Sequence, residues 1–307
     1  MRNIYQHQKS VTAMAAASFD LRQSLVSGAR RIVCLLSTPV VTEEDGCVAL
    51  DRLASAVKQL CALKRAGHEI IVVASGAVGI GQEFLRKQAV LSASLDTITD
   101  GFKKQDNDLG LRVCAAAGQA GLMSLLSTMF GQYEEPCAQI LTEEADFADP
   151  VQRSNFAQAT QALLKVGVIP VINENDVMSR RGTQLRDSEG QVLWDNEPLA
   201  MLIGRECFVD VVLLVGDTPG LLSETGDVVD TFDDGIAVID GGRGSRVGLE
   251  GVRGKVSAAQ QAVRDGWVRA VLMIGVNDIE SASAGEVKGT LFARHSGDEP
   301  GTSRARL

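Results

Sequence analysis

Apolar residues along this chain fall into two kinds of stretch, short unbroken runs and longer stretches with helical spacing. The unbroken runs are typical of strands that are buried on both faces of a parallel sheet. We predict strands at residues 31–36, 69–74, 137–141, 168–172, 209–215 and 269–274, most of which contain such a run. We predict helices at residues 49–65, from a glycine-bearing turn at 75–81 to about 88, and at 111–133, 149–166, 195–203 and 255–265. Strands that alternate with helices indicate an α/β fold, in which a mainly parallel sheet is covered on both faces.

Polar stretches connect these elements. We predict a mobile excursion over the site, or an assembly surface, at residues 87–107, a polar loop at 178–194 and a glycine-rich region at 241–254. The helix that follows the first stretch has a face of small residues, Ala115, Ala116, Gly118 and Ala120. Such a face suits close packing against another helix, either within the fold or across an interface.

Length and charge narrow the possible functions. The chain has 307 residues, of which 45% are hydrophobic, so it can bury the core of one large α/β domain. We expect a single domain over residues 31–307, preceded by a flexible extension at 1–30. The net charge of −9 and the isoelectric point near 5.0 argue against nucleic acid as a partner, because phosphate backbones need a basic face.

Cysteine spacing and hydropathy indicate where in the cell the protein is located. The cysteines never form a CxxC pair, so we expect neither a structural zinc site nor a disulfide scaffold. No apolar run approaches the length of a membrane span, and the N-terminal segment lacks the hydrophobic centre of a secretory signal. We therefore expect a soluble cytoplasmic protein without a membrane partner. Basic residues outnumber acidic ones within residues 1–31, which leaves a mitochondrial presequence as the alternative.

Polar groups gather where the predicted strands end. Asn173 to Asp176 follow the strand at 168–172, and Ser75 follows the strand at 69–74. In open α/β sheets the carboxyl ends of strands are where ligands bind, although such clusters also form solvated turns. Hydroxyl and amide groups with a carboxylate suit a zwitterionic amino acid. Glycines with a lysine at a helix start suit phosphates instead.

Two other chemistries are disfavoured. The chain contains no GxxxxGK[ST] sequence, and residues 248–255, GLEGVRGK, lack the hydroxyl after the lysine. A Ser-His-Asp hydrolase is also disfavoured, because none of His7, His68 and His295 lies at a predicted strand end near a nucleophile.

Several segments occur together in one order. They are SGAV from Ser75, CAAAGQAGLMSLLSTMFGQY from Cys114, AQIL from Ala138, VIPVINEND from Val168, DNEPLA from Asp195, LLVGDTPGLL from Leu213, GLEGVRGK from Gly248 and GTLF from Gly289. In this order they resemble the glutamate 5-kinases of the amino-acid kinase family, and more closely the kinase half of delta-1-pyrroline-5-carboxylate synthases. The resemblance covers residues 31–293.

The resemblance implies a three-layer α/β/α sandwich, with a glutamate-binding part at about residues 31–205 and a nucleotide-binding part at about 206–293. It implies transfer of the γ-phosphate of ATP to the γ-carboxylate of L-glutamate, the first step of proline biosynthesis, with Mg²⁺ carried by the nucleotide. It also implies a homodimer or homotetramer, and proline as a feedback inhibitor. Some relatives add a PUA or a reductase domain, and we expect neither in this chain.

Roles are carried over by position. The resemblance implies that glutamate is bound by Ser75, Gly76, Asn175, Asp176 and Asn196. It implies that the nucleotide is bound by Ser37, Gly216, Asp217, Gly248, Gly251, Val252, Arg253, Gly254 and Lys255, with residues 251–255 as a phosphate-holding loop. Lys255 would act on the transferred phosphoryl group beside Glu197, and no side chain is expected to bind metal. For each residue the alternative is a capping, turn or surface role.

The chain also departs from the family pattern. Where the first strand of the family ends in a lysine and then a glycine before a hydroxyl, this chain has Leu35, Ser37 and Thr38. Glu197 replaces the usual aspartate, and Glu250 adds a negative charge near the phosphates. Losing one positive donor costs on the order of 10²- to 10³-fold in rate, roughly 3–4 kcal/mol. The candidate replacements are Arg31, Arg246 and Arg253.

These departures leave two alternatives open. The first is a catalytically impaired or non-catalytic paralogue that binds glutamate or proline, or regulates a genuine kinase. The second is another specificity within the amino-acid kinases, such as aspartate or N-acetylglutamate.

Overall fold

A seven-stranded sheet forms the centre of the molecule. The computed structural model describes residues 18–91, 107–178, 196–233 and 248–294. The strands are β1 (Arg31–Leu36), β2 (Glu69–Ala74), β3 (Cys137–Thr142), β4 (Ile169–Glu174), β5 (Val211–Gly216), β6 (Ala270–Gly275) and β7 (Thr290–Ala293), in the order β3-β4-β2-β1-β5-β6-β7. All neighbours are parallel except β6 and β7. The mainly parallel sheet is as predicted, whereas β7 was not predicted.

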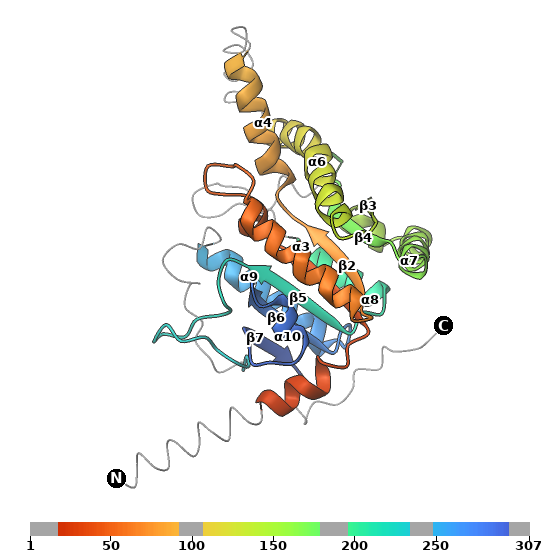
Figure 1. Ribbon diagram of the computed structural model, residues 1–307, viewed down its shortest axis with the longest axis vertical. Coiled ribbons are helices and arrows are strands. Elements are labelled where there is room, and N and C mark those ends of the chain that lie inside the picture. The colour runs from red at the N-terminus through yellow and green to blue at the C-terminus, as the bar shows by residue number, and fades with distance from the viewer. Residues whose placement is uncertain (1–17, 92–106, 179–195, 234–247, 295–307) are drawn as a thin grey trace.

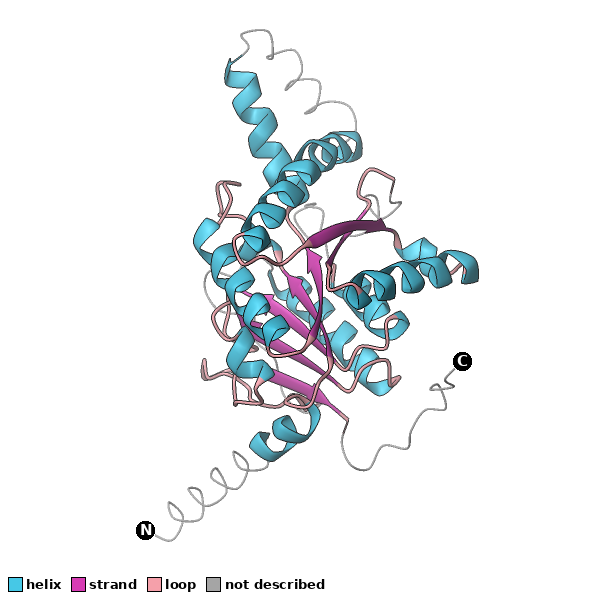
Figure 2. Ribbon diagram, turned by 45° about the vertical axis from the view of Figure 1, so that its right-hand side comes forward, coloured by secondary structure: helices cyan, strands magenta, loops and turns pink. Residues whose placement is uncertain are grey.

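Helices cover both faces of this sheet, as Figures 1 and 2 show. The helices are α2 (Thr38–Val41), α3 (Leu50–Arg65), α4 (Ala77–Leu91), α6 (Asn107–Gly131), the 3₁₀ helix η1 (Glu144–Phe147), α7 (Pro150–Lys165), α8 (Glu197–Glu206), α9 (Gly248–Arg264) and α10 (Ile279–Ser283). α3, α6 and α10 pack on one face, and α8 and α9 pack on the other. The α/β/α sandwich is therefore confirmed.

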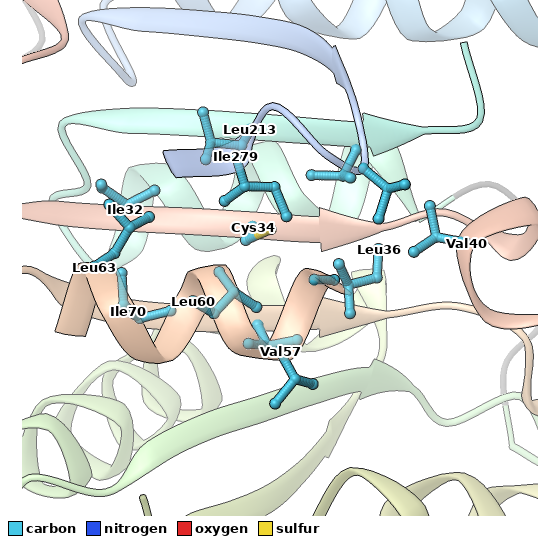
Figure 3. Packing of buried hydrophobic residues seen from close by; sticks show 14 of the residues in the cluster. Ile32, Cys34, Leu36, Val40, Val57, Leu60, Leu63, Ile70, Leu213 and Ile279 are labelled. Carbon is cyan, nitrogen blue, oxygen red and sulfur yellow. The ribbon is translucent and has the colours of Figure 1, made fainter. Parts of the chain in front are cut away.

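The central strand β1 supplies side chains to both cores. Ile32, Cys34 and Leu36 share one core with Val57 and Leu60 of α3, and Figure 3 shows these side chains near one another. Val33 and Leu35 belong to the opposite core. Each apolar side chain of this size stabilises the fold by about 1.5–3 kcal/mol when fully buried. The unbroken apolar run thus follows from burial on both faces.

The described part of the N-terminal extension is docked on this sandwich. Residues 18–25 are helical, and the Arg22 side chain is fully buried. Its guanidinium donates to the carbonyl oxygens of Asp230, Lys288 and Gly289 at 2.6, 2.7 and 2.8 Å. Burial lowers the pKa of Arg22 to about 10. From residue 18 onward the N-terminal extension therefore packs against the sandwich, and residues 1–17 lie outside the described residues.

α4 and α6 cross at two glycines. A Cβ atom at Gly81 would lie 1.8 Å from the carbonyl oxygen of Cys114, and one at Gly118 would lie 1.9 Å from that of Ala77. Part of the small face of α6 therefore packs within the fold, while Ala120 stays exposed. Of the polar stretches, residues 92–106, 179–195 and 234–247 lie outside the described residues.

α6 contradicts the expectation that no apolar stretch approaches the length of a membrane span. The segment Gly110–Gly131 contains a stretch with a mean hydropathy of 1.4 and is long and apolar enough to cross a membrane by length and composition alone. Leu122, Leu126 and Phe130 of the same helix are buried in the core of the sandwich.

Candidate functional site

Two cavities meet at the carboxyl end of β1. One is an open cleft of about 540 Å³, and the other is a small pocket of about 30 Å³. Ser37 lines the pocket, whereas the next residue, Thr38, lines the cleft. β1 lies between β2 and β5, so the chain direction across the sheet reverses here. This is the crevice where ligands of open α/β sheets bind.

A buried polar network forms the floor of the cleft. The Asn196 Nδ2 donates to Ser75 Oγ at 3.0 Å and to Asn173 Oδ1 at 3.2 Å. The Asn173 Nδ2 in turn donates to Gln119 Oε1 of α6 at 2.8 Å. Ser75, Asn173 and Asn196 are all buried, and these bonds fix their side chains. These hydrogen bonds thus join the residue after β2, a residue of β4, a residue of α6 and the residue before α8.

The first turn of α4 forms a wall of the same cleft. Gly76 precedes it with φ of 100°, and a Cβ atom there would lie 2.8 Å from Val41 Cγ1, so only glycine fits. Gly76 to Gly79 line the cleft. Because the first amide groups of a helix have no partner within it, this wall suits an anionic group such as a carboxylate.

The rim of the cleft carries several charges. Asp176 lines it, together with Glu43, Glu44, Asp45, Glu83 and Arg86. The Arg86 guanidinium contacts the Glu83 carboxylate at 2.6 Å, and this hydrogen bond lowers the pKa of Glu83. Among the described residues that line the cleft, Arg86 is the one cation.

The small pocket holds the other predicted group of residues. Ser37, Glu197, Gly216, Asp217, Val252 and Lys255 line it with the apolar residues Leu35, Leu214, Met273 and Ile274. The Lys255 Nζ lies 3.0 Å from Glu197 Oε1, and the two side chains are only 12% and 3% exposed. Ser37 Oγ is buried without a hydrogen-bond partner among the described residues.

Some predicted site residues lie elsewhere. The glycine-rich loop expected at 241–254 is helical from Gly248, so Gly251 and Gly254 lie inside α9. Only Val252 and Lys255, three positions apart on one helix face, line the pocket, whereas Arg253 and Gly254 are exposed. Apolar packing of α9 on the sheet outweighs the low helix propensity of its glycines.

Other site residues were missed or misplaced. Asn175 is not among the described residues that line the cleft, and its N–H donates to the Thr142 carbonyl oxygen at 2.9 Å. Gln119 and Arg86 were not predicted, because both lie on the sides of helices rather than at strand ends. The described residues contain no cluster of three His, Cys, Asp or Glu side chains that could hold a metal ion.

Comparisons with known proteins agree with this arrangement. Residues 30–273 match the model of the Amino acid kinase family. A delta-1-pyrroline-5-carboxylate synthase of Solanum lycopersicum is 36% identical over 282 residues, which are 89% of this chain and 38% of that protein. A glutamate 5-kinase of Caldanaerobacter subterraneus subsp. tengcongensis is 31% identical over 85% of this chain and 67% of its own length. The chain thus spans about two fifths of the length of the synthases it matches.

A solved structure shares the fold. The carbamate kinase of Giardia lamblia bound to AMP-PNP aligns with a TM-score of 0.58 and 15% identity, over 88% of this chain and 100% of that one. Two cavities at the carboxyl end of the central strand, one with an amide network and one with a buried lysine, accompany this shared fold. The match over most of its length shows that this chain belongs to the amino acid kinase family.

Proposed function

We propose that this chain transfers the γ-phosphoryl group of ATP to the γ-carboxylate of L-glutamate, the first step of proline biosynthesis. Relatives with the names glutamate 5-kinase and delta-1-pyrroline-5-carboxylate synthase, at 30–36% identity, support this reaction. The observation that carries the proposal is the junction of the two cavities. The amide-lined cleft and the pocket of Lys255 adjoin at the neighbouring residues Ser37 and Thr38, so an acceptor in one would lie beside a donor in the other.

The cleft suits a small dicarboxylic amino acid. One carboxylate of glutamate would bind at the first turn of α4 beside Ser75, where amide groups and a hydroxyl can donate. The ammonium group would bind near Asp176, whose charge is opposite. The hydrogen bonds that fix Ser75 and Asn196 then help to hold the γ-carboxylate, which accepts the phosphoryl group, in one orientation. Positioning of this kind is a main way in which enzymes promote phosphoryl transfer.

The pocket suits the transferring end of a nucleotide. Its volume of about 30 Å³ fits a phosphoryl-sized group, so the rest of the nucleotide would lie outside it. A γ-carboxylate oxygen attacks the γ-phosphorus, the bond from phosphorus to the bridging oxygen breaks, and ADP leaves. Lys255 stabilises the negative charge on the phosphoryl oxygens, and Glu197 holds the ammonium group of Lys255 in place. Mg²⁺ bound with the nucleotide would neutralise further charge.

The charge of the pocket predicts slow turnover. Lys255 is the one cation among the described residues that line it, and Glu197 offsets part of its charge. Leu35 lines the pocket where the family pattern has a second lysine. Since one positioned donor is worth on the order of 10²- to 10³-fold, we expect a rate below that of a kinase with both lysines.

The decisive assay traps the acyl phosphate. The purified chain is incubated with glutamate, ATP and Mg²⁺ in the presence of hydroxylamine, and the hydroxamate is measured. We expect product from the wild type and from Lys165→Ala, an exposed lysine of α7, and none from Lys255→Ala. Aspartate and N-acetylglutamate serve as competing acceptors. A folded wild-type chain that forms no hydroxamate at any enzyme concentration would refute the proposal, and glutamate binding without ATP binding in calorimetry would favour a non-catalytic role.

We further propose a homodimer or homotetramer, inhibition by proline and a cytoplasmic location. The exposed small residues Ala116 and Ala120 on α6 support close packing of a second copy. Light scattering on the wild type and on Ala120→Trp tests the assembly, and a monomeric wild type would overturn it. Proline titration in the hydroxamate assay tests inhibition. Cell fractionation separates the cytoplasm from the mitochondrion, which the basic residues near the N-terminus leave as the alternative.

A further inference from the structure

We propose that the Ser37 hydroxyl is a catalytic hydrogen-bond donor to the phosphoryl group during its transfer. The inference rests on the proposed kinase function and deepens it. Lys255 is the one cation among the described residues that line the pocket. The uncharged Ser37 hydroxyl would supply part of the remaining stabilisation of the phosphoryl charge.

The first observation is that the Ser37 hydroxyl makes no hydrogen bond to any residue that the structure describes. Ser37 is only 6% exposed, and its Oγ has no hydrogen-bond partner among the described residues. Ser37 occupies the N-cap position of α2, yet its side chain makes no capping bond there. The Val40 N–H donates instead to the Ser37 carbonyl oxygen at 2.9 Å. Buried hydroxyls are nearly always paired, so an unpaired one in a pocket points to a ligand.

The second observation is where the hydroxyl lies. Ser37 Oγ is 3.9 Å from the position that a Cβ atom would occupy on Gly216, so it faces the end of β5. The Ser37 N–H donates to the Val215 carbonyl oxygen at 3.1 Å, which fixes the backbone. The same pocket contains Lys255 and Glu197, and the following residue lines the glutamate cleft. Ser37 therefore lies where the pocket of Lys255 adjoins the glutamate cleft.

The third observation concerns what else lines the pocket. Leu35, two residues earlier, faces the same pocket, because side chains alternate along a strand. It offers no donor to a phosphoryl oxygen. In the transition state negative charge is spread over the equatorial oxygens of the phosphoryl group. Lys255 serves some of these oxygens, and the Ser37 O–H donates a hydrogen bond to another without transferring its proton.

Replacement of Ser37 by alanine tests the assignment. Since the hydrogen bond acts on charge that develops during transfer, we expect kcat to fall about 10- to 100-fold. The KM for glutamate and the Kd of a non-hydrolysable ATP analogue should change less than about threefold. The melting temperature should stay the same or rise, because the substitution removes an unpaired buried polar group. Ser283→Ala, a buried serine of α10 that donates to the Ile279 carbonyl oxygen, is the control and should leave kcat unchanged.

The outcomes separate this inference from the proposed function. An active wild type with an equally active Ser37→Ala overturns the role of Ser37 alone. A parallel loss of kcat and of melting temperature in Ser37→Ala also overturns it, because that result indicates a structural role. A wild type without kinase activity overturns both proposals. A loss of kcat with intact stability and intact nucleotide affinity supports the assignment.

Discussion

The buried ion pair of Lys255 and Glu197 should contribute measurably to the free energy of unfolding. Replacing Lys255 by methionine keeps most of the volume of the side chain but leaves the Glu197 carboxylate, 3% exposed, without its partner. Two unit charges 3.0 Å apart attract by about 5–6 kcal/mol at an effective dielectric constant of about 20. Desolvation of both groups opposes this attraction. Removing one partner of a buried pair typically costs about 3–5 kcal/mol, and since Lys255 is 12% exposed we expect about 3.

The pair should behave differently when both charges are removed. In Lys255→Met combined with Glu197→Gln no buried charge is left alone, so we expect stability within about 1 kcal/mol of the wild type. The double-mutant cycle should therefore give a coupling energy of about 2 kcal/mol or more. Urea unfolding followed by circular dichroism measures all four proteins, and equal m values show that the same surface unfolds in each. Costs for the two single variants that add up within about 0.5 kcal/mol would refute the reasoning.

Three further predictions follow from other parts of the structure. Gly118→Ala places a Cβ atom 1.9 Å from the Ala77 carbonyl oxygen and should lower the free energy of unfolding, measured by thermal unfolding, by about 1–3 kcal/mol or more. In the control Gly121→Ala the Cβ atom meets Ile80 Cγ2 at 3.7 Å, so this variant should be as stable as the wild type or more stable. Gln119→Ala frees the Asn173 amide and should raise the glutamate KM several-fold with little change in kcat, whereas an unchanged KM would contradict its positioning role. Arg86 lowers the pKa of Glu83 below 4.5, so Glu83 contributes stability above that pH and loses it as pH falls through the lowered pKa. The difference in melting temperature between the wild type and Glu83→Gln should shrink from pH 6 to pH 3, and a constant difference would contradict this.

The strands at the centre of the sheet could be predicted closely because they are buried on both faces. The runs at 31–36 and 69–74 match β1 and β2 residue for residue. The last strand escaped prediction, because four residues that pair antiparallel at the edge of a sheet carry too short a pattern. The start of α9 was placed at Lys255 instead of Gly248, since glycines normally mark loops and only tertiary packing holds them in this helix.

The site could be predicted only where it depends on strand ends. Ser75, Asp176 and Asn196 are distant in sequence, yet the parallel sheet brings them into one cleft as expected. Gln119 accepts a hydrogen bond from Asn173 of that cleft, and it lies on α6, whose close crossing with α4 at glycines has no local pattern in the sequence. The free hydroxyl of Ser37 depends on the absence of a capping bond, which only coordinates reveal.

The position of β1 in the sheet has a consequence for synthesis on the ribosome. β1 pairs on one side with β2, which follows soon in the chain, and on the other with β5, whose first residue is Val211. At about 5–20 residues per second, the chain from Leu36 to Val211 takes on the order of 10–40 s to emerge. During that time one edge of β1, which is apolar from Ile32 to Leu36, has no neighbour. The nascent chain should therefore depend on chaperones mainly in this interval, and its dependence should end once β5 has left the exit tunnel.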